Sequence, residues 1–393
     1  MTRYEPDTPA PLRTPATSKP TSAINVELLR RFAADLEIPS YVLGALPDIR
    51  PASPAKVTES TGHQGDDPMR RRTLLAAVPA GLLTRLDHTL AMPTQPTTAA
   101  EALGAATQYQ RARNLFDAGR LAQLIAALPD LLATAHADTR THEPAAYAQL
   151  TACYTLASES LNKAGVHEAS RLTADRAVVF ADFAESPLSR TLAARALGIV
   201  LRHQAQHSLA DEVTLAAVTA LEATGLPTPE HMATYALTLC TAAYNAAQAG
   251  RREAAASLIT EAERAAAGLT VRTLSGHPLA LTSAQVTLYR LGIHWSLGDA
   301  GAGLHAARGL RPEHFPTPER RARLHTDRAR AWAQRGKPAE TARALLNAHA
   351  EAPAEVRNRP SIRTLANDLV RDHRGTPEVR LLATTLARPG VTR

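Results

Sequence analysis

The sequence predicts an all-α protein built as an α-solenoid, which is a stack of helical hairpins. Aromatic residues make up only 4% of the chain and hydrophobic residues 45%, so alanine and leucine supply most of the core. Such residues suit closely packed helices better than β-sheets. A glycine also recurs where one apolar-periodic segment ends and the next begins, at Gly119, Gly165, Gly250, Gly298 and Gly336. Glycine enters the left-handed backbone region without a Cβ clash, and repeated helix–turn–helix units are typical of solenoids.

Residues 98–393 carry this repeating pattern. The turns follow one another about every 40–48 residues, a longer spacing than the roughly 34 residues of a strict tetratricopeptide repeat. We therefore expect a degenerate, tetratricopeptide-like α-solenoid of about six to seven helical hairpins. The expected hairpins are 98–117 with 120–136, 144–163 with 166–184, 188–206 with 208–224, 229–248 with 251–268, 278–297 with 299–309, 317–335 with 338–351, and a terminal pair, 360–373 with 376–387.

The segment before the repeats divides into three parts. Residues 1–23 are rich in proline and threonine, and we expect them to be disordered. Residues 24–46 contain a short amphipathic helix that ends before Pro39. Residues 47–97 are expected to form a polar linker, broken by prolines and glycines, that carries a short helix.

The linker contains one segment with two interpretations. From Met69 to Val78 a cluster of three arginines precedes an apolar run, as in a twin-arginine or secretory signal. The run is short, and Pro79 and Gly81 interrupt it. We therefore interpret it as a linker helix whose apolar face packs on the first repeat. Export would be the alternative if translation began at Met69.

The net charge, the cysteines and the apolar runs bear on where in the cell the protein is expected. The net charge is +7, and arginine supplies nearly all of the basic residues. Codon bias in a GC-rich genome and a surface that binds anions both fit this composition. The two cysteines, Cys153 and Cys240, lie in separate helical segments and outside any CxxC motif. No apolar run reaches transmembrane length. We therefore expect a cytoplasmic protein that does not enter a membrane and has no disulfide framework.

Four segments together resemble one family of bacterial regulators. They are DPMRRRTLL at residues 67–75, ARNLFDAGR at 112–120, LTADRA at 172–177 and FPTPERR at 315–321. They are similar to the C-terminal part of XRE (Cro/CI-type) transcriptional regulators, which join a helix-turn-helix to a tetratricopeptide-like domain. The resemblance covers roughly residues 24–390. It rests on these four sequence segments and on no catalytic motif.

The resemblance implies a DNA-reading domain that is largely missing here. In the family, the helix-turn-helix lies N-terminal to the linker, and residues 24–43 match only its last helix. The preceding 23 residues are too few for four further helices of roughly ten residues each. A wrongly assigned start codon, a truncation and an adaptor paralogue all fit this pattern. Because full-length members bind paired half-sites as dimers, the resemblance also implies a homodimer.

No pattern in the sequence predicts catalysis, a cofactor or a metal site. His203, His207 and Asp211 have metal-like helical spacing, but no second cluster supports them, and we interpret the histidines as exposed helix residues. The glycine-rich stretch from Gly298 to Gly303 follows no strand, so a tight turn between packed helices is expected. No nucleophile motif is present. We therefore expect a binding protein and not an enzyme.

The inner surface of the stack is the predicted binding site. In tetratricopeptide-like folds the first helix of each hairpin lines the concave groove. Arg195 and Arg202, and likewise Arg323 and Arg330, are seven residues apart and so share a helix face. Amides suit a peptide main chain and arginines suit a carboxylate. Counting back from each turn predicts a groove lined by Tyr109, Arg113, Phe116, Glu159, Asn162, Arg195, Arg202, Tyr244, Gln248, Gln285, Trp295, Arg323, Arg330 and Gln334, with Thr155 near them.

These observations lead to two functional hypotheses. In the first, a transcriptional-regulator-like protein binds a peptide, small-molecule or protein effector in the groove. DNA would then be contacted by a helix-turn-helix that is missing from this chain or supplied by a partner. In the second, the solenoid is a scaffold or adaptor that binds another protein and reads no DNA.

Overall fold

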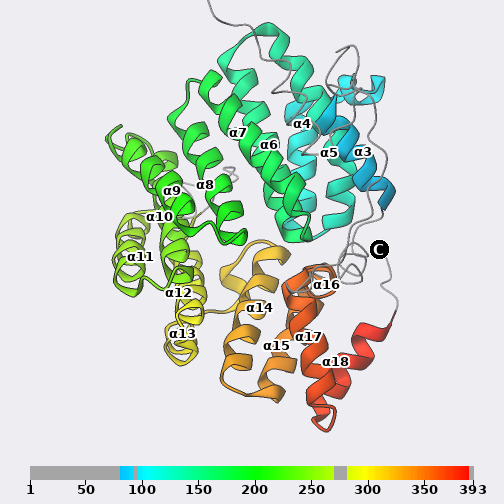
Figure 1. Ribbon diagram of the computed structural model, residues 1–393, viewed down its shortest axis with the longest axis vertical. Helices are drawn as coiled ribbons and strands as arrows, with labels where there is room; N and C mark the ends of the chain where they lie inside the picture. Colours follow the sequence, from blue (N-terminus) through cyan, green and yellow to red (C-terminus); the bar gives the residue numbers. More distant parts are fainter. Residues whose placement is uncertain (1–79, 93–94, 270–280, 389–393) are drawn as a thin grey trace, which may run out of the picture. The chain divides into compact units, whose positions relative to one another are not determined.

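The computed structural model describes residues 80–92, 95–269 and 281–388, which Figure 1 draws as coloured ribbons. Contacts divide the chain into residues 1–65 and residues 66–393, and all described residues belong to the second unit. The predicted segments 1–23 and 24–46, and the part of the linker before residue 80, lie outside the described residues.

The described part of the chain is all α-helical and carries no strand, as predicted. Seven hairpins follow one another along it. They are α4 (Thr98–Asp117) with α5 (Leu121–Asp138), α6 (Pro144–Ala164) with α7 (His167–Phe183), α8 (Pro187–His203) with α9 (His207–Glu222), α10 (Pro229–Gln248) with α11 (Arg252–Ala267), α12 (Ser283–Ser296) with α13 (Ala300–Ala306), α14 (Pro318–Gln334) with α15 (Pro338–Glu351), and α17 (Pro360–Asp372) with α18 (Pro377–Ala387). None of these helices is long and apolar enough to cross a membrane.

Local sequence explains where the helices begin and end. Many begin with proline at the first position, where the missing N–H costs nothing. The glycines that mark the predicted turns all have positive φ, between 64° and 83°, which confirms their left-handed conformation. The α8–α9 turn has no glycine, and Ala205 takes the same conformation with φ of 59°.

Two short helices were not expected individually. The first, α3 (Ala80–Ala91), lies in the predicted linker and buries Leu86 and Leu90 against α5. The run from Met69 to Val78 lies outside the described residues. Between the sixth and last hairpins the chain forms an additional short helix, α16 (Pro353–Arg357), which the apolar pattern does not predict. Its five residues bury Glu355 and Val356, so it carries a charge into the interior.

Alanine allows the helices to pack closely, and α10 shows this most clearly. Every residue from Ala233 to Ala247 is buried, because α8, α9, α11 and α12 surround this helix. Such complete burial is possible because many of its side chains are alanine or threonine. The two cysteines, Cys153 and Cys240, are also buried and unpaired.

The stack curves until its beginning meets its end. Figure 1 shows α16 beside the ends of α4 and α6, although these helices are far apart in the sequence. A Cβ added to Gly119 would lie 2.8 Å from the Cβ of Ala352, and one added to Gly165 would lie 2.6 Å from Cγ of Pro360. We call these contacts, together with the ion pairs of Lys163 described next, the closure interface.

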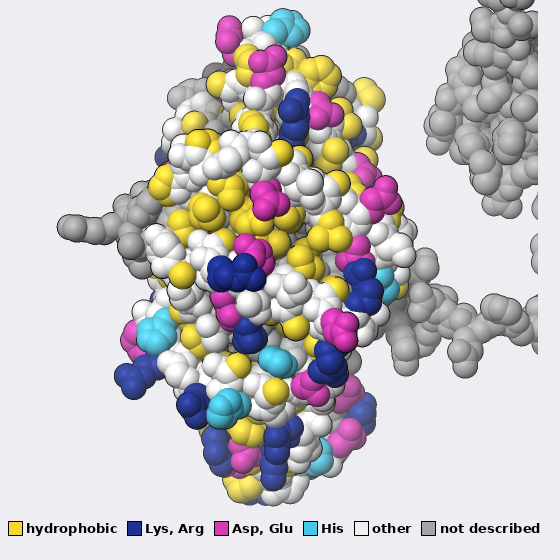
Figure 2. Space-filling model, turned by 90° about the vertical axis from the view of Figure 1, so that its left-hand side faces the viewer, with side chains coloured by type: hydrophobic (Ala, Val, Ile, Leu, Met, Phe, Trp, Pro, Cys, Tyr) yellow, Lys and Arg dark blue, Asp and Glu magenta, His cyan; other side chains and the backbone are white. Residues whose placement is uncertain are grey.

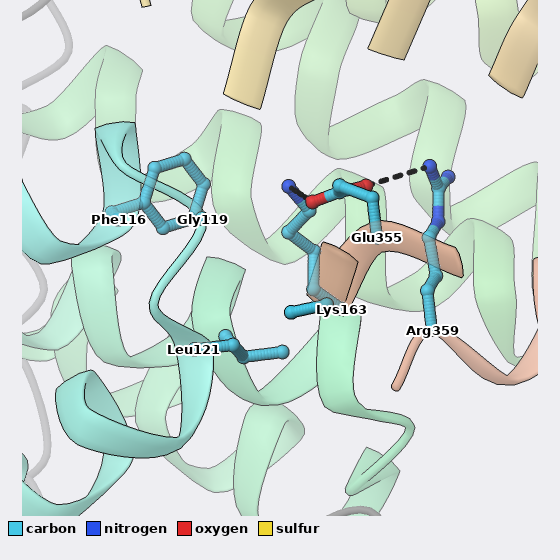
Figure 3. A pocket seen from close by; sticks show the side chains of 7 residues that line it. Phe116, Gly119, Leu121, Lys163, Glu355 and Arg359 are labelled. Atoms are coloured by element: carbon cyan, nitrogen blue, oxygen red, sulfur yellow. Dashed lines mark ion pairs between the residues drawn. The ribbon is translucent and has the colours of Figure 1, made fainter. Parts of the chain in front are cut away.

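Lys163, at the end of α6, is the charged centre of the closure interface. Its Nζ lies 2.6 Å from Oε1 of Glu319 in α14 and also pairs with Glu355 in α16. Figure 3 shows this lysine beside Glu355, with Phe116 on the neighbouring turn. The Phe116 ring centroid is 4.9 Å from the ammonium nitrogen. A lysine with two carboxylates and an aromatic ring around it joins the first two hairpins to the last part of the stack.

Candidate functional site: a central arginine-lined cavity

The curved stack encloses a cavity of about 400 Å³. The first helices of five hairpins, α4 to α12, line it mostly with their C-terminal halves, α14 lines it along most of its length, and the start of α17 completes the wall. The closure interface forms one side, since Lys163 and Glu319 belong to both. The concave surface is therefore a partly open cavity, and the closure interface covers one of its sides.

Ten of the fourteen groove residues predicted from the sequence line this cavity. They come from six hairpins, and the curvature of the stack turns them toward one another. They are Phe116, Glu159, Asn162, Arg195, Arg202, Tyr244, Gln248, Trp295, Arg323 and Arg330.

The other four predicted groove residues do not line the cavity. Tyr109 packs against the core of the first hairpins, and Arg113 pairs with Asp117 at 2.9 Å. Gln285 lines a small side cavity next to Tyr244. Gln334 is exposed, and its amide donates to the carbonyl of Trp295. Counting back from each turn places residues along a helix, but it does not say which helix face the curvature will cover.

Several residues that line the cavity were not among the predicted groove residues. The described residues that line the cavity and were not expected there are Lys163, Gly165, His167, Ile199, His203, Thr241, Tyr289, Glu319, Arg320, Arg359, Pro360 and Ser361. Lys163 stands within a predicted turn motif, which was a usable signal. Arg359 had none, because it reaches the cavity only through the curvature of the whole stack.

Most of the cavity cations have carboxylate partners. Arg195 is only 5% exposed, and its Nη1 donates to Oε1 of Glu159 at 2.6 Å. Arg323 donates to Asp327 at 2.7 Å, and Arg330 contacts the other oxygen of the same carboxylate at 3.4 Å. Burial raises the pKa of Glu319, but Lys163 and Arg320 outweigh that effect, so its pKa lies well below the usual value.

Arg202 differs, because no carboxylate pairs with it in the described structure. Its Nη1 donates to Oδ1 of Asn245 at 2.8 Å, and its guanidinium carbon stacks 4.6 Å from the Tyr244 ring centroid. Its Nε is buried and has no hydrogen-bond partner. Burial, together with the positive charges of Arg323 and Arg195, lowers the pKa of Arg202 to about 10. The guanidinium is thus fixed in place but electrostatically unsatisfied.

Arg359 and Arg330 line the same cavity, but each has a carboxylate partner. Burial and the neighbouring Arg330 and Arg323 lower the pKa of Arg359 to about 10, and its Nη1 has no hydrogen-bond partner. Its nearest carboxylate, on Glu355, is 3.6 Å away. Arg330 stacks over Trp295 at 5.0 Å and donates to Oγ of Ser361 at 2.8 Å.

His203 lies among these arginines. The interpretation of His203 as an ordinary exposed helix residue was incomplete, because its exposed surface faces the cavity. The surrounding helices displace much of the bulk water. Burial, followed by the charges of Arg202 and Arg359, therefore lowers the pKa of His203 well below its usual value. His207 begins the next helix, so the two histidines do not share one helix face.

The fold and the cavity define a helical-repeat protein with a cation-rich central site. Among the described residues, no cluster of three or more His, Cys, Asp or Glu side chains is arranged to hold a metal ion. The chain has no significant match among protein-family models, curated proteins or solved structures. Functional inference therefore depends on the cavity itself.

Proposed function

We propose that this chain is a cytoplasmic, transcriptional-regulator-like protein whose tetratricopeptide-like repeats bind an effector in the central cavity. One observation supports the effector site: Arg202 lines the central cavity, and no carboxylate of the described residues pairs with it. A buried cation without a counter-charge is unfavourable in the empty protein, and a ligand that supplies the charge offsets that cost. The arginine is held by Asn245 and Tyr244, so it is already oriented for a ligand.

The regulatory part of the proposal comes from the four segments that resemble XRE regulators. DNA would be contacted by a helix-turn-helix outside the described residues or on a partner. Effector binding would be coupled to DNA binding through the closure interface, because Lys163 contacts both the cavity and helices from opposite ends of the stack. A ligand that binds the closed form more tightly than an open form would shift the population toward closure.

A cavity-blocking variant tests this proposal without assuming the chemistry of the ligand. Ile199 lines the cavity, so Ile199→Trp should fill part of it. We expect cells carrying this variant to show the transcript profile of a deletion strain. Leu381→Trp on α18, where Leu381 is 57% exposed, is the matched control and should behave as wild type. If the profile of Ile199→Trp cells equals that of wild type, the cavity is not the effector site.

The alternative, a protein-binding scaffold, is favoured by a different surface. Leu172, Val179 and Phe183 are exposed along one face of α7, and Leu209 and Leu215 are exposed on α9. Figure 2 shows hydrophobic side chains gathered in the middle of the face where α9 and α11 lie, with charged side chains more frequent below them. Exposed apolar patches often mark protein-binding surfaces. In a pull-down experiment, loss of the bound partner protein with Val179→Asp/Phe183→Asp, but not with Ile199→Trp, would favour this function.

A further inference from the structure

The charges around the cavity do not balance. Seven cationic side chains line it, namely Lys163, Arg195, Arg202, Arg320, Arg323, Arg330 and Arg359. The carboxylates that pair with them are four, namely Glu159, Glu319, Asp327 and Glu355. The cavity wall therefore carries an excess of positive charge that the described residues do not neutralise.

Among the described residues, two of the three buried arginine N–H groups without a hydrogen-bond partner belong to side chains near His203, which marks one end of the cavity; the third is Nε of Arg195. Nε of Arg202 and Nη1 of Arg359 are both buried without a hydrogen-bond partner. Both arginines, together with Arg330, impose their positive charge on His203, so the four side chains share one electrostatic environment. Guanidinium N–H groups left free in this way match the oxygens of phosphate and carboxylate groups.

The start of α17 contributes to the same end of the cavity. Pro360 and Ser361, its first two residues, line the wall, and Arg330 donates to Ser361. Pro360 has no N–H, and the Ile362 N–H donates to the Arg359 carbonyl. The start of this helix therefore offers the Ser361 N–H and the positive end of the helix dipole to an anion. Two features of different origin, guanidinium groups and a helix terminus, thus favour an anion at one place.

We propose that this end of the cavity binds a compact ligand with at least two negative charges on phosphoryl or carboxylate groups, held by Arg202, Arg330 and Arg359. The inference rests on the proposed effector site and specifies its chemistry. One oxyanion group would accept N–H bonds from Arg202 and Arg359, and a second charge would offset the remaining excess along the wall.

The size of the cavity favours a small ligand. The closure interface joins the two ends of the stack, and the cavity volume of about 400 Å³ is in the range of small-molecule sites. A nucleic-acid backbone needs an open basic surface, whereas these arginines lie inside. The ligand is therefore expected to be a single small molecule and not a long extended peptide or a nucleic-acid strand.

Titration calorimetry with inorganic pyrophosphate and with citrate tests the inference and distinguishes the two oxyanion classes. Acetate, which carries one charge, is the control ligand, and ionic strength is held constant with sodium chloride. We expect pyrophosphate or citrate to bind the wild-type chain at least tenfold more tightly than acetate. The stronger of the two shows whether phosphoryl or carboxylate groups are preferred.

Four variants, one of them a control, locate the site. Arg202→Gln and Arg359→Gln should each weaken binding at least tenfold. Arg343→Gln is the matched control, because Arg343 is 58% exposed and pairs with Glu378 away from the cavity; its affinity should stay within twofold of wild type. Arg202→Lys retains the charge and should bind more tightly than Arg202→Gln. Circular dichroism confirms that each variant is folded.

Two results would overturn the inference. One is a wild-type chain that binds neither pyrophosphate nor citrate more tightly than acetate. The other is equal affinity in wild type, Arg202→Gln and Arg359→Gln. Neither result affects the Ile199→Trp experiment, which depends on the volume of the cavity and not on its charge. A wrong ligand class and a wrong effector site therefore give different outcomes.

Discussion

Individual buried side chains connect the stability of this protein to pH. Burial lowers the pKa of His325, and the charge of Arg328 lowers it further. Burial and Arg176 do the same for His136, which also contacts the Tyr154 hydroxyl at 2.7 Å. These histidines stay neutral in the fold at a pH where they would take up a proton in the unfolded chain.

The sign of the pH effect follows from this difference. Below the ordinary histidine pKa of about 6.5 the unfolded chain binds more protons than the folded one, so stability falls as pH falls. We expect the free energy of unfolding in urea to be lower at pH 5.5 than at pH 7.5. Each such histidine lowers the free energy of unfolding by at most about 1.4 kcal/mol between pH 6.5 and pH 5.5. His325→Asn should reduce this difference, and an unchanged pH dependence in that variant would contradict the explanation.

Single helices are specified by signals that the sequence displays. Ser186, Thr228, Thr282 and Thr317 each precede a helix and accept a hydrogen bond from the N–H three residues later. This bond satisfies one of the backbone donors that a helix start leaves free. Proline at the next position is common for the same reason. These signals are local, so they place element boundaries without knowledge of the fold.

The capping bonds can be tested with a matched pair. Thr317→Ala removes a hydroxyl that accepts from the Arg320 N–H at 3.3 Å, and it should lower the free energy of unfolding by about 1 kcal/mol. Thr376 occupies the same position before α18 but makes no side-chain capping bond. Thr376→Ala should therefore change stability by only a few tenths of a kcal/mol. Urea denaturation measures both, and equal losses would mean that the hydroxyl of Thr317 does not cap its helix.

At the scale of the whole molecule, closure of the stack is the decisive feature. Gly165 has φ of 79° and also leaves no room for a Cβ beside Pro360. Gly250 has φ of 76° but no neighbour within 4 Å of a Cβ. The two glycines therefore share the backbone requirement and differ only in the contact with the far end of the stack.

This difference isolates the energy of closure. Gly250→Ala should lose about 1 kcal/mol, because alanine is strained at positive φ. Gly165→Ala should lower the free energy of unfolding by that amount and by roughly a further 1–3 kcal/mol, because its Cβ overpacks against Pro360. Small-angle X-ray scattering should also show a larger radius of gyration for Gly165→Ala alone. The same loss and the same radius in both variants would show that the ends of the stack do not meet in solution.

The sequence by itself determined the helices, their turns and much of the cavity lining. These depend on local causes, such as helical periodicity, positive φ at turn glycines and proline at helix starts. Arg195 and Arg202 could be assigned to one helix face because their seven-residue spacing is a property of any helix. The same logic placed Glu159, Tyr244 and Trp295 on first helices, which line the cavity.

Only the tertiary structure decided that the groove closes. The rotation from one hairpin to the next is small, and its sum over seven hairpins brings residues together that are far apart in sequence. Lys163 meets Glu319 across 156 positions, and Arg359 reaches the cavity from the last hairpin. No local sequence pattern predicts the total rotation that these small steps produce. Arg202 and Arg359 also come near the same histidine only through closure, because one belongs to α8 and the other precedes α17.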